Sequence, residues 1–470
     1  MENNTTKKSF WERFTIPNSY VIIFIIIALA ALLTWVIPAG QYDRTTDPNT
    51  GREIVVQGSY HEVEASPVGP VGAIKAIADG FVSASDITFF IIFAYGFVHV
   101  LMKNGTFDAI IGTVMRWFRN ADWMLFVAIM ILFGALGSTM GMAEETYGMF
   151  PIFIGLAAAL GYDAIVGGAI VSIGASTGFA AATLNPFTVG VASGIAGVNL
   201  TDALWYRLIC WVVFEAIAIT FTLRYAFKIK KDPTKSILYG TKLDLATSGM
   251  TKEELMSIKM TGRHKACAAI FVITIGLLVY GTMKYGWYIQ ELSTLFIIAM
   301  IAAAIVGGNN ANQIAESFVE AGRIMLNGAM MVGMARAILV VLQSGMIIDT
   351  VVYGLASILN GTSGMISGVL MVIVQNIINF FIPSGSGQAA VSMPIMAPLA
   401  DMLGVTRQVA VLAFQFGDGF SNMFWPTSVC MVCGLMGIPL NKWYKFAAPL
   451  FGLFMIAEIV LIVGAVFVGL

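Results

Sequence analysis

Charged side chains are scarce in this sequence, in which only 11% of the 470 residues are Asp, Glu, Lys or Arg. A soluble domain carries about 25% charged residues, and a soluble chain of this length would form about three domains. The 26 basic and 27 acidic side chains are too few to cover three such surfaces, and 58% of the residues are hydrophobic. The composition therefore excludes a soluble enzyme and a disordered chain, and it indicates that most of the surface faces lipid.

Cysteine and histidine are also rare, with four and three residues. All four cysteines lie in or beside apolar segments, which excludes a secreted disulfide scaffold. Cys430 and Cys433 form one C-x-x-C motif, without the second pair or nearby histidines of a zinc set. We therefore expect no cofactor and no metal apart from a candidate coupling Na⁺. The chain also lacks a phosphate-binding P-loop and a basic nucleic-acid footprint, which disfavours ATP-driven transport and a nucleic-acid partner.

Apolar runs of about 20 residues recur along the whole chain, and each can span the hydrocarbon of a bilayer as a helix. A β-barrel would instead show shorter segments of alternating polarity. The pattern predicts an all-α polytopic membrane protein that is not an enzyme. The first run, Tyr20–Ile37, follows Lys7, Lys8 and Arg13. Because the run is long and many spans follow, we interpret it as an uncleaved first span.

The charges orient the chain in the membrane. Residues 224–265 hold ten of the 26 basic residues against four acidic ones. By the positive-inside rule the loop 227–264 is cytoplasmic, and so is the N-terminal segment 1–19. The acid-rich loop 41–70 is predicted to be external. We expect a multi-pass protein of the cytoplasmic (inner) membrane.

Motifs of the segment 20–226 recur in the same order in the segment 265–470. One span precedes the first repeat and two precede the second, at about 266–283 and 292–307, so the repeats enter from opposite sides and the C-terminus is predicted to be external. Two inverted-topology repeats are an architecture of secondary transporters. The amphipathic stretches Ile74–Ala84 and Gln313–Arg323 are predicted to be equivalent interfacial arms. The matched motifs are Pro151 with Pro394, Gly178-Phe179 with Gly419-Phe420, Pro186 with Pro426, and Trp205-Tyr206-Arg207 with Trp443-Tyr444-Lys445.

Each half has two places where polar residues, Gly or Pro interrupt an apolar segment. Irregular backbone at membrane depth is tolerated only inside protein or along a watery cavity. Paired breaks in corresponding positions of two halves are the best sequence indication of a transport site. The alternative is kinked, closely packed helices. The four breaks are 141–146, 182–187, 383–388 and 417–427.

Ionisable residues inside apolar segments are costly in lipid and usually functional. Glu144, Glu145 and Asp418 lie in the predicted breaks. Arg336 lies in an otherwise apolar span, where it either faces a substrate carboxylate or forms a structural pair with Asp86 or with an acidic residue of the site.

Other acids have simpler interpretations. Glu215 and Glu458 are interpreted as partners of inter-helix or inter-subunit pairs. Asp163, Asp108 and Asp349 lie near predicted helix ends, where a solvated or capping role is expected.

The segments Gly141-Met-Ala-Glu-Glu-Thr146, Thr183-Leu-Asn-Pro-Phe187, Ile382-Pro-Ser-Gly-Ser-Gly387 and Met393-Pro-Ile-Met-Ala-Pro-Leu399 resemble those of the YfcC family. That family is grouped with the C4-dicarboxylate anaerobic carriers (DcuC-like) in the ion transporter superfamily. The resemblance runs from about Pro17 to the C-terminus. It implies an ion-coupled secondary transporter or exchanger, usually a homodimer, in which a transport domain moves as an elevator against a scaffold domain.

By the same resemblance, each half supplies one re-entrant hairpin and one broken helix. The hairpin tips would be 144–146 and 384–387, and the helix breaks 183–186 and 421–427. The superfamily often has Ser-Asn-Thr at such tips, whereas this chain has Glu-Glu-Thr and Ser-Gly-Ser. The expected substrate-binding residues are Glu144, Glu145, Thr146, Thr183, Asn185, Pro186, Arg336, Ser384, Gly385, Ser386, Gly387, Asp418, Asn422 and Thr427.

The acidic residues at the predicted site favour a substrate that carries a positive group. A dianion would face Glu144, Glu145 and Asp418, at about 4 kcal/mol for each like-charge contact of 4 Å. An amino acid could place its ammonium or guanidinium on these acids and its carboxylate on the N–H groups of 384–387 and on Arg336. The residues thus favour a cationic or zwitterionic group, and the resemblance implies a basic amino acid such as arginine or ornithine in preference to a C4-dicarboxylate or short organic acid. Members that resemble arginine/ornithine exchangers also fall within the family.

The coupling ion stays open between Na⁺, H⁺ and neither. Candidate oxygen donors for Na⁺ come from Thr183, Asn185, Ser421, Asn422 and Asp418. A proton could instead bind to Glu144, Glu145 or Asp418, and a pure exchanger needs no ion.

Other functional classes fit less well. An intramembrane aspartyl protease would need Gly-x-Gly-Asp, but Gln415 stands where the first Gly of that motif belongs before Asp418. A channel would need a continuous polar path rather than two convergent clusters. A receptor would need a sizeable soluble domain, and the largest hydrophilic segment is the loop 227–264.

Overall fold

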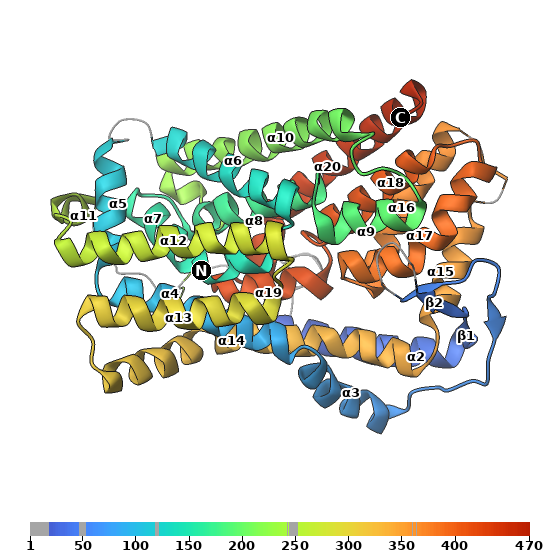
Figure 1. The fold of residues 1–470 in the computed structure, drawn as a ribbon, viewed down its shortest axis with the longest axis horizontal. Coiled ribbons are helices and arrows are strands. Elements are labelled where there is room, and N and C mark those ends of the chain that lie inside the picture. The colour runs from blue at the N-terminus through green and yellow to red at the C-terminus, as the bar shows by residue number, and fades with distance from the viewer. Residues whose placement is uncertain are drawn as a thin grey trace, which may run out of the picture.

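A computed structural model describes residues 18–46, 53–117, 122–241, 243, 252–359, 361–362 and 364–470. The predicted cytoplasmic N-terminal segment, with Lys7, Lys8 and Arg13, therefore lies outside the described residues apart from its last two positions. Helices dominate the fold (Figure 1).

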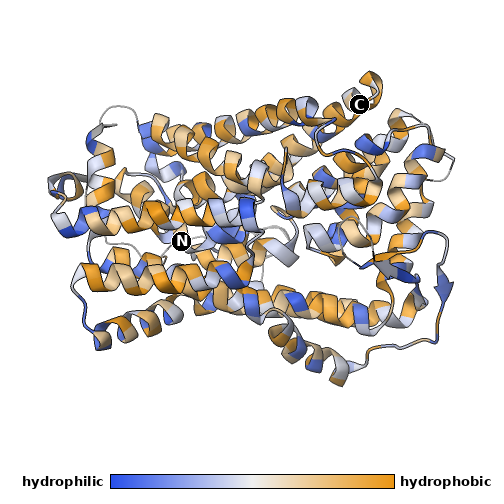
Figure 2. Ribbon diagram, in the orientation of Figure 1, coloured by the Kyte–Doolittle hydropathy of each residue, from blue (hydrophilic) through white to orange (hydrophobic). Residues whose placement is uncertain are grey.

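Eight helices in the described part of the chain are long and apolar enough to cross a membrane. This agrees with the prediction of a polytopic helical membrane protein, because each helix coincides with an apolar run. Figure 2 shows that these helices are mostly hydrophobic, while hydrophilic residues lie at the two ends of the bundle and near its middle. The eight are α2 (Ser19–Val36), α4 (Ser85–Lys103), α6 (Asp122–Met140), α10 (Leu204–Lys231), α12 (Gly262–Tyr285), α13 (Ile289–Gly307), α14 (Ala311–Ser344) and α20 (Leu440–Val468).

Two helical hairpins reverse the chain at polar tips. Hairpin 1 consists of α6, the 3₁₀ turn η1 (Glu144–Met149) and α7 (Phe150–Ala159). Its two legs contact each other through the rings of Phe133 and Phe153, whose centroids are 5.6 Å apart. Hairpin 2 consists of α16 (Met365–Phe381) and α17 (Gly385–Met402). Its legs are joined by Gln388, whose Nε2 donates to the backbone oxygen of Gln375 over 2.9 Å.

Each hairpin packs both of its legs against a helix that is itself interrupted. Hairpin 1 packs on α8 (Ala164–Ala180), which is followed by the first break, residues 181–185. Hairpin 2 packs on α18 (Arg407–Ser421), which is followed by the second break, residues 422–425. The helices resume as the π-helical turn η2 (Pro186–Gly190) with α9 (Val191–Ala196), and as α19 (Pro426–Met436).

Glycine permits the close packing of α6 on α8. A Cβ atom on Gly178 would lie only 1.9 Å from the backbone oxygen of Gly134. No side chain fits there, so the two backbones approach as they do at other small-residue contacts between membrane helices.

The helices form two groups that meet in the middle of the bundle. In the first group, α14 packs on α2, on α4 and on α3 (Pro70–Ser83), and α13 packs on α4 and α12. The second group holds the two hairpins with α8, α10, α18 and α20. The groups touch where α4 meets η1 and where α14 meets α19.

Short elements close the two ends of the bundle (Figure 1). At one end α5 (Thr106–Trp117) packs on α11 (Lys252–Ser257), and Arg116 Nη1 donates to the oxygen of Met256 over 2.7 Å. The turn η3 (Pro233–Lys235) follows α10. Since α10 continues to Lys231 and α12 begins at Gly262, helix ends lie inside the predicted loop 227–264.

The opposite end carries α15 (Ile348–Ser357) and four short strands that the all-α prediction did not include. Strand β1 (Gly40–Gln41) pairs antiparallel with β4 (His61–Glu62), and β2 (Arg44–Thr46) with β3 (Glu53–Val55). Asp349 was expected to be solvated or capping, and this was wrong, because it is 4% exposed. It is buried because it accepts hydrogen bonds from Arg44 Nη2 at 3.1 Å and from the amide of Tyr42 at 3.0 Å.

Two further expectations about helix ends have different outcomes. Asp163 is the N-cap of α8 and accepts from the amide of Val166 over 3.0 Å, as predicted. The second arm, Gln313–Arg323, is not a separate element, because α14 continues without interruption from Ala311 to Ser344. The first arm is the separate helix α3, which ends before α4 at Ala84.

Candidate substrate site

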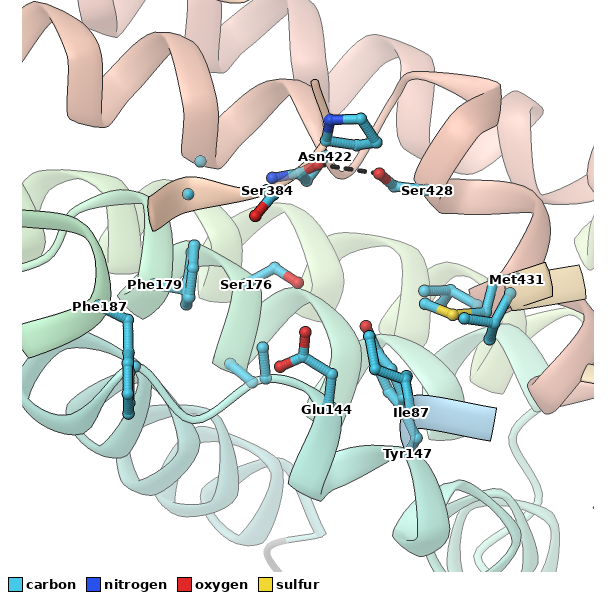
Figure 3. A pocket seen from close by; sticks show the side chains of 18 of the residues that line it. Ile87, Glu144, Tyr147, Ser176, Phe179, Phe187, Ser384, Asn422, Ser428 and Met431 are labelled. Carbon is cyan, nitrogen blue, oxygen red and sulfur yellow. Dashed lines mark hydrogen bonds between the residues drawn. The ribbon is translucent and has the colours of Figure 1, made fainter. Parts of the chain in front are cut away.

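A cavity of about 240 Å³ lies where the two helix groups meet. Both hairpin tips and the second break line it, and so do α8, η2, α4 and α14. Figure 3 shows side chains from these elements converging on one space. Of the residues expected at the substrate site, those that line the cavity are Glu144, Glu145, Thr146, Arg336, Ser384, Gly385, Ser386, Asn422 and Thr427.

The two adjacent acids of the first tip differ in their surroundings. Glu145 bends back onto its own tip, where its Oε2 accepts from the amide of Ala143 over 2.9 Å. Glu144 turns its carboxylate into the cavity, towards Ser176 and Ser384 (Figure 3). Glu144 is therefore the better placed of the two to contact a bound cation.

The second tip presents the start of a helix to the cavity. Ser384 is the N-cap of α17, and its Oγ accepts from the amide of Gly387 over 3.4 Å. The first N–H groups of a helix have no partner within the helix and carry a partial positive charge. With Gly385 and Ser386 as the first two residues of α17, this tip offers N–H groups to a substrate carboxylate.

The second break adds neutral polar groups. The amide oxygen of Asn422 accepts from the hydroxyl of Ser428 over 2.9 Å (Figure 3), and its nitrogen donates to the backbone oxygen of Asp418 over 2.9 Å. The buried hydroxyl of Thr427, one residue into α19, has no hydrogen-bond partner among the described residues. A bound molecule can therefore use Thr427 without breaking an existing hydrogen bond.

Arg336 lines the cavity from α14, on the side of the first helix group. Its Nε donates to the hydroxyl of Ser83 over 3.2 Å. The expected alternative, a pair with Asp86, is not found, and no ion pair to Arg336 occurs within the described ranges. Its charge is therefore available to a bound anion.

The first break lies beside the cavity without lining it. Thr183 is tied to the end of α6, because its hydroxyl donates to the backbone oxygen of Ser138 over 3.2 Å. Asn185 accepts from the amide of Phe187 over 2.9 Å and packs against Gly141. Pro186 opens the turn η2. The residues of this segment that reach the cavity are Phe187 and Thr188.

Asp418, Ser421 and Gly387 lie close behind the cavity wall. The sequence placed Asp418 in a helix break, and this was wrong, because it lies within α18, one turn before that helix ends. The helix continues to Ser421, whose hydroxyl donates to the backbone oxygen of Gly417 over 2.7 Å. Gly387 belongs to the first turn of α17.

Several lining residues were not identified from the sequence. Phe187 is the last residue of the predicted break 182–187, and Tyr147 directly follows a predicted tip, so their positions offered a signal. Tyr288 comes from the connection between α12 and α13, and its ring centroid lies 5.4 Å from that of Phe187. Nothing in the local sequence brings Tyr288 to the hairpins. Further such residues include Ser172, Ser176, Phe179 and Ser428.

The chain matches the family model described as C4-dicarboxylate anaerobic carrier (DcuC) over residues 16–467. YfcC of Escherichia coli (strain K12), named as a candidate basic amino acid antiporter, is 31% identical over 97% of this chain and 98% of that protein. A protein of Haemophilus influenzae (strain ATCC 51907 / DSM 11121 / KW20 / Rd), uncharacterized by name, is 29% identical over 96% of this chain and 97% of its own length.

Two solved structures of transport proteins are also similar. Neisseria gonorrhoeae MtrF, described with a class of antimetabolite efflux pumps, is 16% identical with a TM-score of 0.43, over 97% of this chain and 96% of that one. The Alcanivorax borkumensis YdaH transporter is 14% identical with a TM-score of 0.45, over 97% and 99%.

The family expected from the tip and break motifs is confirmed by the match over nearly the whole chain. The role of the protein is accordingly transport across a lipid bilayer rather than enzymatic catalysis. This chain belongs to the C4-dicarboxylate anaerobic carrier (DcuC) family and is a multi-span membrane transporter.

Proposed function

We propose that this protein is a secondary active exchanger of a small amino acid-type carboxylate, with basic amino acids such as arginine or ornithine favoured. It acts in the cytoplasmic membrane as a homodimer, by an elevator mechanism. The observation that carries the proposal is the charge arrangement of one cavity. Glu144 projects into it from hairpin 1, while Arg336 and the start of α17 line it from other sides.

This arrangement suits a molecule with opposite charges at its two ends. An ammonium or guanidinium group on Glu144 forms a charge-assisted hydrogen bond, and the substrate carboxylate takes the N–H groups of α17 or the guanidinium of Arg336. The volume of about 240 Å³ is suitable for a small solute. Tyr147, Phe179, Phe187 and Tyr288 supply the apolar wall that an aliphatic chain needs.

The order of elements supports two inverted repeats. Hairpin 1, α8, the first break, α9 and α10 are followed later by hairpin 2, α18, the second break, α19 and α20. In both series the interrupted helix carries both legs of its hairpin. One long helix precedes the first series in addition to α4, and two precede the second in addition to α14, so the series start on opposite sides of the bilayer.

An elevator movement is supported by the division into two helix groups. The hairpins and interrupted helices form one group, and the cavity lies at its border with the group of α4 and α14. A substrate held by the second group, which contains the hairpins, would change sides when that group slides along the first. Arg336 would stay behind, which would release the substrate carboxylate on one side.

A second candidate function is a Na⁺- or H⁺-coupled carrier of C4-dicarboxylates. The description of the family favours it, and Arg336 with the start of α17 could hold one carboxylate. The second carboxylate of such a substrate would then face Glu144. Charge repulsion makes this candidate the weaker one unless Glu144 is protonated.

For coupling, we infer that buried oxygens behind the cavity supply the ion site, if an ion is used at all. Asp418 and Ser421 lie behind hairpin 2, and Thr183 and Asn185 lie at the end of α6. Counterflow rates that do not respond to either a Na⁺ or a pH gradient would leave pure exchange.

The test compares Glu144→Gln with its neighbour Glu145→Gln in proteoliposomes, using counterflow of labelled arginine, ornithine, neutral amino acids and succinate. A charged hydrogen bond is worth about 1.5–3 kcal/mol, so Glu144→Gln should weaken affinity for arginine by about tenfold or more. Glu145→Gln is the matched control and should change that affinity much less, because Glu145 is bonded to its own tip. Transport of succinate but of no amino acid would refute the proposal.

A further inference from the structure

A second buried carboxylate, Glu215 on α10, lies outside the cavity and is not used by the proposed substrate site. Its side chain is 4% exposed, and neither carboxylate oxygen has a hydrogen-bond partner among the described residues. The expected inter-helix pair is therefore absent from the described part of the chain. Burial also keeps a partner subunit from reaching the carboxylate.

The carboxylate of Glu215 packs directly against Gly134, a glycine of hairpin 1. A Cβ atom on Gly134 would lie 2.4 Å from Oε2 of Glu215, so any larger residue at position 134 would collide with that carboxylate. Gly134 is also in close contact with α8, because a Cβ atom on Gly178 would lie 1.9 Å from the backbone oxygen of Gly134. Glu215 is thus enclosed where α6, α8 and α10 pack together.

Few charged side chains face the Glu215 carboxylate from the helices packed around it. Helix α8 has no ionisable residue, and α6 has only Asp122, which is 12 residues or about 18 Å along the helix from Gly134 and pairs with Lys230. On α10 itself, Arg207 is eight residues away and bonded to Gln408, Cys210 is a buried thiol five residues away, and Arg224 is nine residues away in the other direction. The other ionisable residues of α10 are Tyr206, Tyr225, Lys228, Lys230 and Lys231. Helix α20 carries Glu458, Lys442, Tyr444 and Lys445, and η3 carries Lys235, which pairs with Asp232.

Another buried acid, on the neighbouring helix α20, gives no compensation. Glu458 on α20 is fully buried, and both of its carboxylate oxygens also lack a hydrogen-bond partner among the described residues. A second acid cannot neutralise the first. Asp418 lies on α18 between Phe416 and Phe420, whose rings pack on Phe214, the residue before Glu215. Asp418 is itself hydrogen-bonded to Asn379.

A buried, ionised carboxylate without a partner destabilises the protein by several kcal/mol. Binding a proton neutralises the carboxylate and removes this cost. We propose that Glu215 is a proton-binding site, separate from the substrate cavity and loaded in the conformation described here. The carboxylate takes one proton from water to become a neutral acid, and it returns that proton to water when α6 moves away from α10. Each transfer forms one O–H bond on the acceptor and breaks the O–H bond of the donor, and no electrons are transferred.

The contact between Glu215 and Gly134 lies close to the tip of hairpin 1, and this position links proton binding to the transport cycle. Gly134 lies six residues, or about 9 Å, before the end of α6, and the tip with Glu144 follows directly. A movement of hairpin 1 on substrate binding is therefore transmitted along α6 to the contact between Gly134 and Glu215. This coupling rests on the proposed function, whereas the binding of a proton by Glu215 does not.

Infrared spectroscopy of the full chain in lipid tests proton binding without any substrate. The C=O stretching band of protonated carboxyl groups is recorded during a pH titration of the wild type and of Glu215→Gln. We expect the variant to lose part of this band, with Glu458 supplying a remainder. Glu320→Gln changes a half-exposed acid that pairs with Lys103, and it should leave the band recorded at neutral pH unchanged, because Glu320 is ionised there. An identical band in the wild type and Glu215→Gln would overturn the proposal.

Proton movement is then measured in proteoliposomes that contain a pH-sensitive dye, with arginine or ornithine as the added substrate. Wild-type protein should move protons together with the substrate. Glu215→Gln should lose at least nine-tenths of the proton signal, about tenfold, while counterflow of labelled substrate continues. Glu215→Asp keeps an acid and should keep the signal with a shifted pH midpoint. This second variant also serves if the amide variant does not fold.

The outcomes separate the two proposals. If no amino acid is transported but the infrared band depends on Glu215, the proposed substrate is wrong and the proton site stands. If amino acids are transported and Glu215→Gln moves protons as the wild type does, the proton site is refuted and the exchanger stands.

Discussion

Asn379 on α16 donates a hydrogen bond of 2.9 Å from Nδ2 to Oδ1 of Asp418 on α18, and both side chains are fully buried. The bond joins hairpin 2 to the helix that precedes the second break. The other oxygen of Asp418 has no hydrogen-bond partner among the described residues. It lies 3.1 Å from the position that a Cβ atom would take on Gly385. The carboxyl group of Asp418 is thus held directly behind the tip that faces the substrate cavity.

Asp418→Asn tests whether this carboxylate couples transport to an ion. Asparagine has the same shape but cannot bind a proton or balance a cation. We expect accumulation driven by a Na⁺ or pH gradient to fall by about tenfold, a loss of about 1.4 kcal/mol of coupling, while counterflow persists. Uptake with and without each gradient measures this in proteoliposomes. Undiminished accumulation would assign Asp418 a structural role.

Gly385→Ala tests the tight packing of the hairpin 2 tip. The added methyl group would lie 2.5 Å from Cγ2 of Thr188, closer than atoms can approach, so the tip must shift. Overpacking of this kind costs about 1–3 kcal/mol, and we expect counterflow to slow by about tenfold.

The matched control is Gly452→Ala on α20, where a Cβ atom meets nothing within 4 Å. Counterflow of labelled substrate and thermal unfolding are measured for both variants. Gly452→Ala should transport like the wild type. A normal rate for Gly385→Ala would show that the tip tolerates displacement.

Arg336→Ala tests whether this side chain holds the substrate carboxylate. We expect affinity for arginine to fall by about tenfold to a hundredfold, since a hydrogen bond between charged groups contributes about 1.5–3 kcal/mol. The decarboxylated analogue of arginine lacks the group that Arg336 would bind, so its weaker inhibition should not change.

Competition in the counterflow assay gives both affinities. Arg336→Lys keeps the positive charge and should lose less affinity than the alanine variant. An equal loss for arginine and for its decarboxylated analogue would place Arg336 outside the carboxylate site.

The fold class could be read from the chain because a membrane restricts what an apolar run can do. A run of about 20 apolar residues has to form a spanning helix, and the eight long helices appear where such runs occur. The short strands beside α15 could not be foreseen in the same way. They depend on Asp349, more than 300 residues away in the sequence, which binds Arg44 and the amide of Tyr42.

The site could be predicted in part, for a related reason. Polar residues at Glu144 and Ser384 interrupt apolar segments, and such interruptions need protein or water around them. Which side chain of a tip faces the cavity was not predictable, since Glu144 and Glu145 are neighbours in one tight turn. Tyr288 gave no signal, because its place at the cavity comes from the packing of α12 and α13 against the rest of the bundle.

The sequence by itself determined that this is a helical membrane transporter with interrupted helices, because hydrophobic length and misplaced polarity are local properties of a chain. The tertiary structure alone decided which ionisable groups share a cavity and which are isolated. Glu144 and Arg336, 192 positions apart in the sequence, line one space, whereas Glu215 is enclosed without a partner among the described residues. The role of an ionisable side chain depends on the groups around it. Helices that are distant in the sequence supply those groups, so the role is decided only when the helices pack.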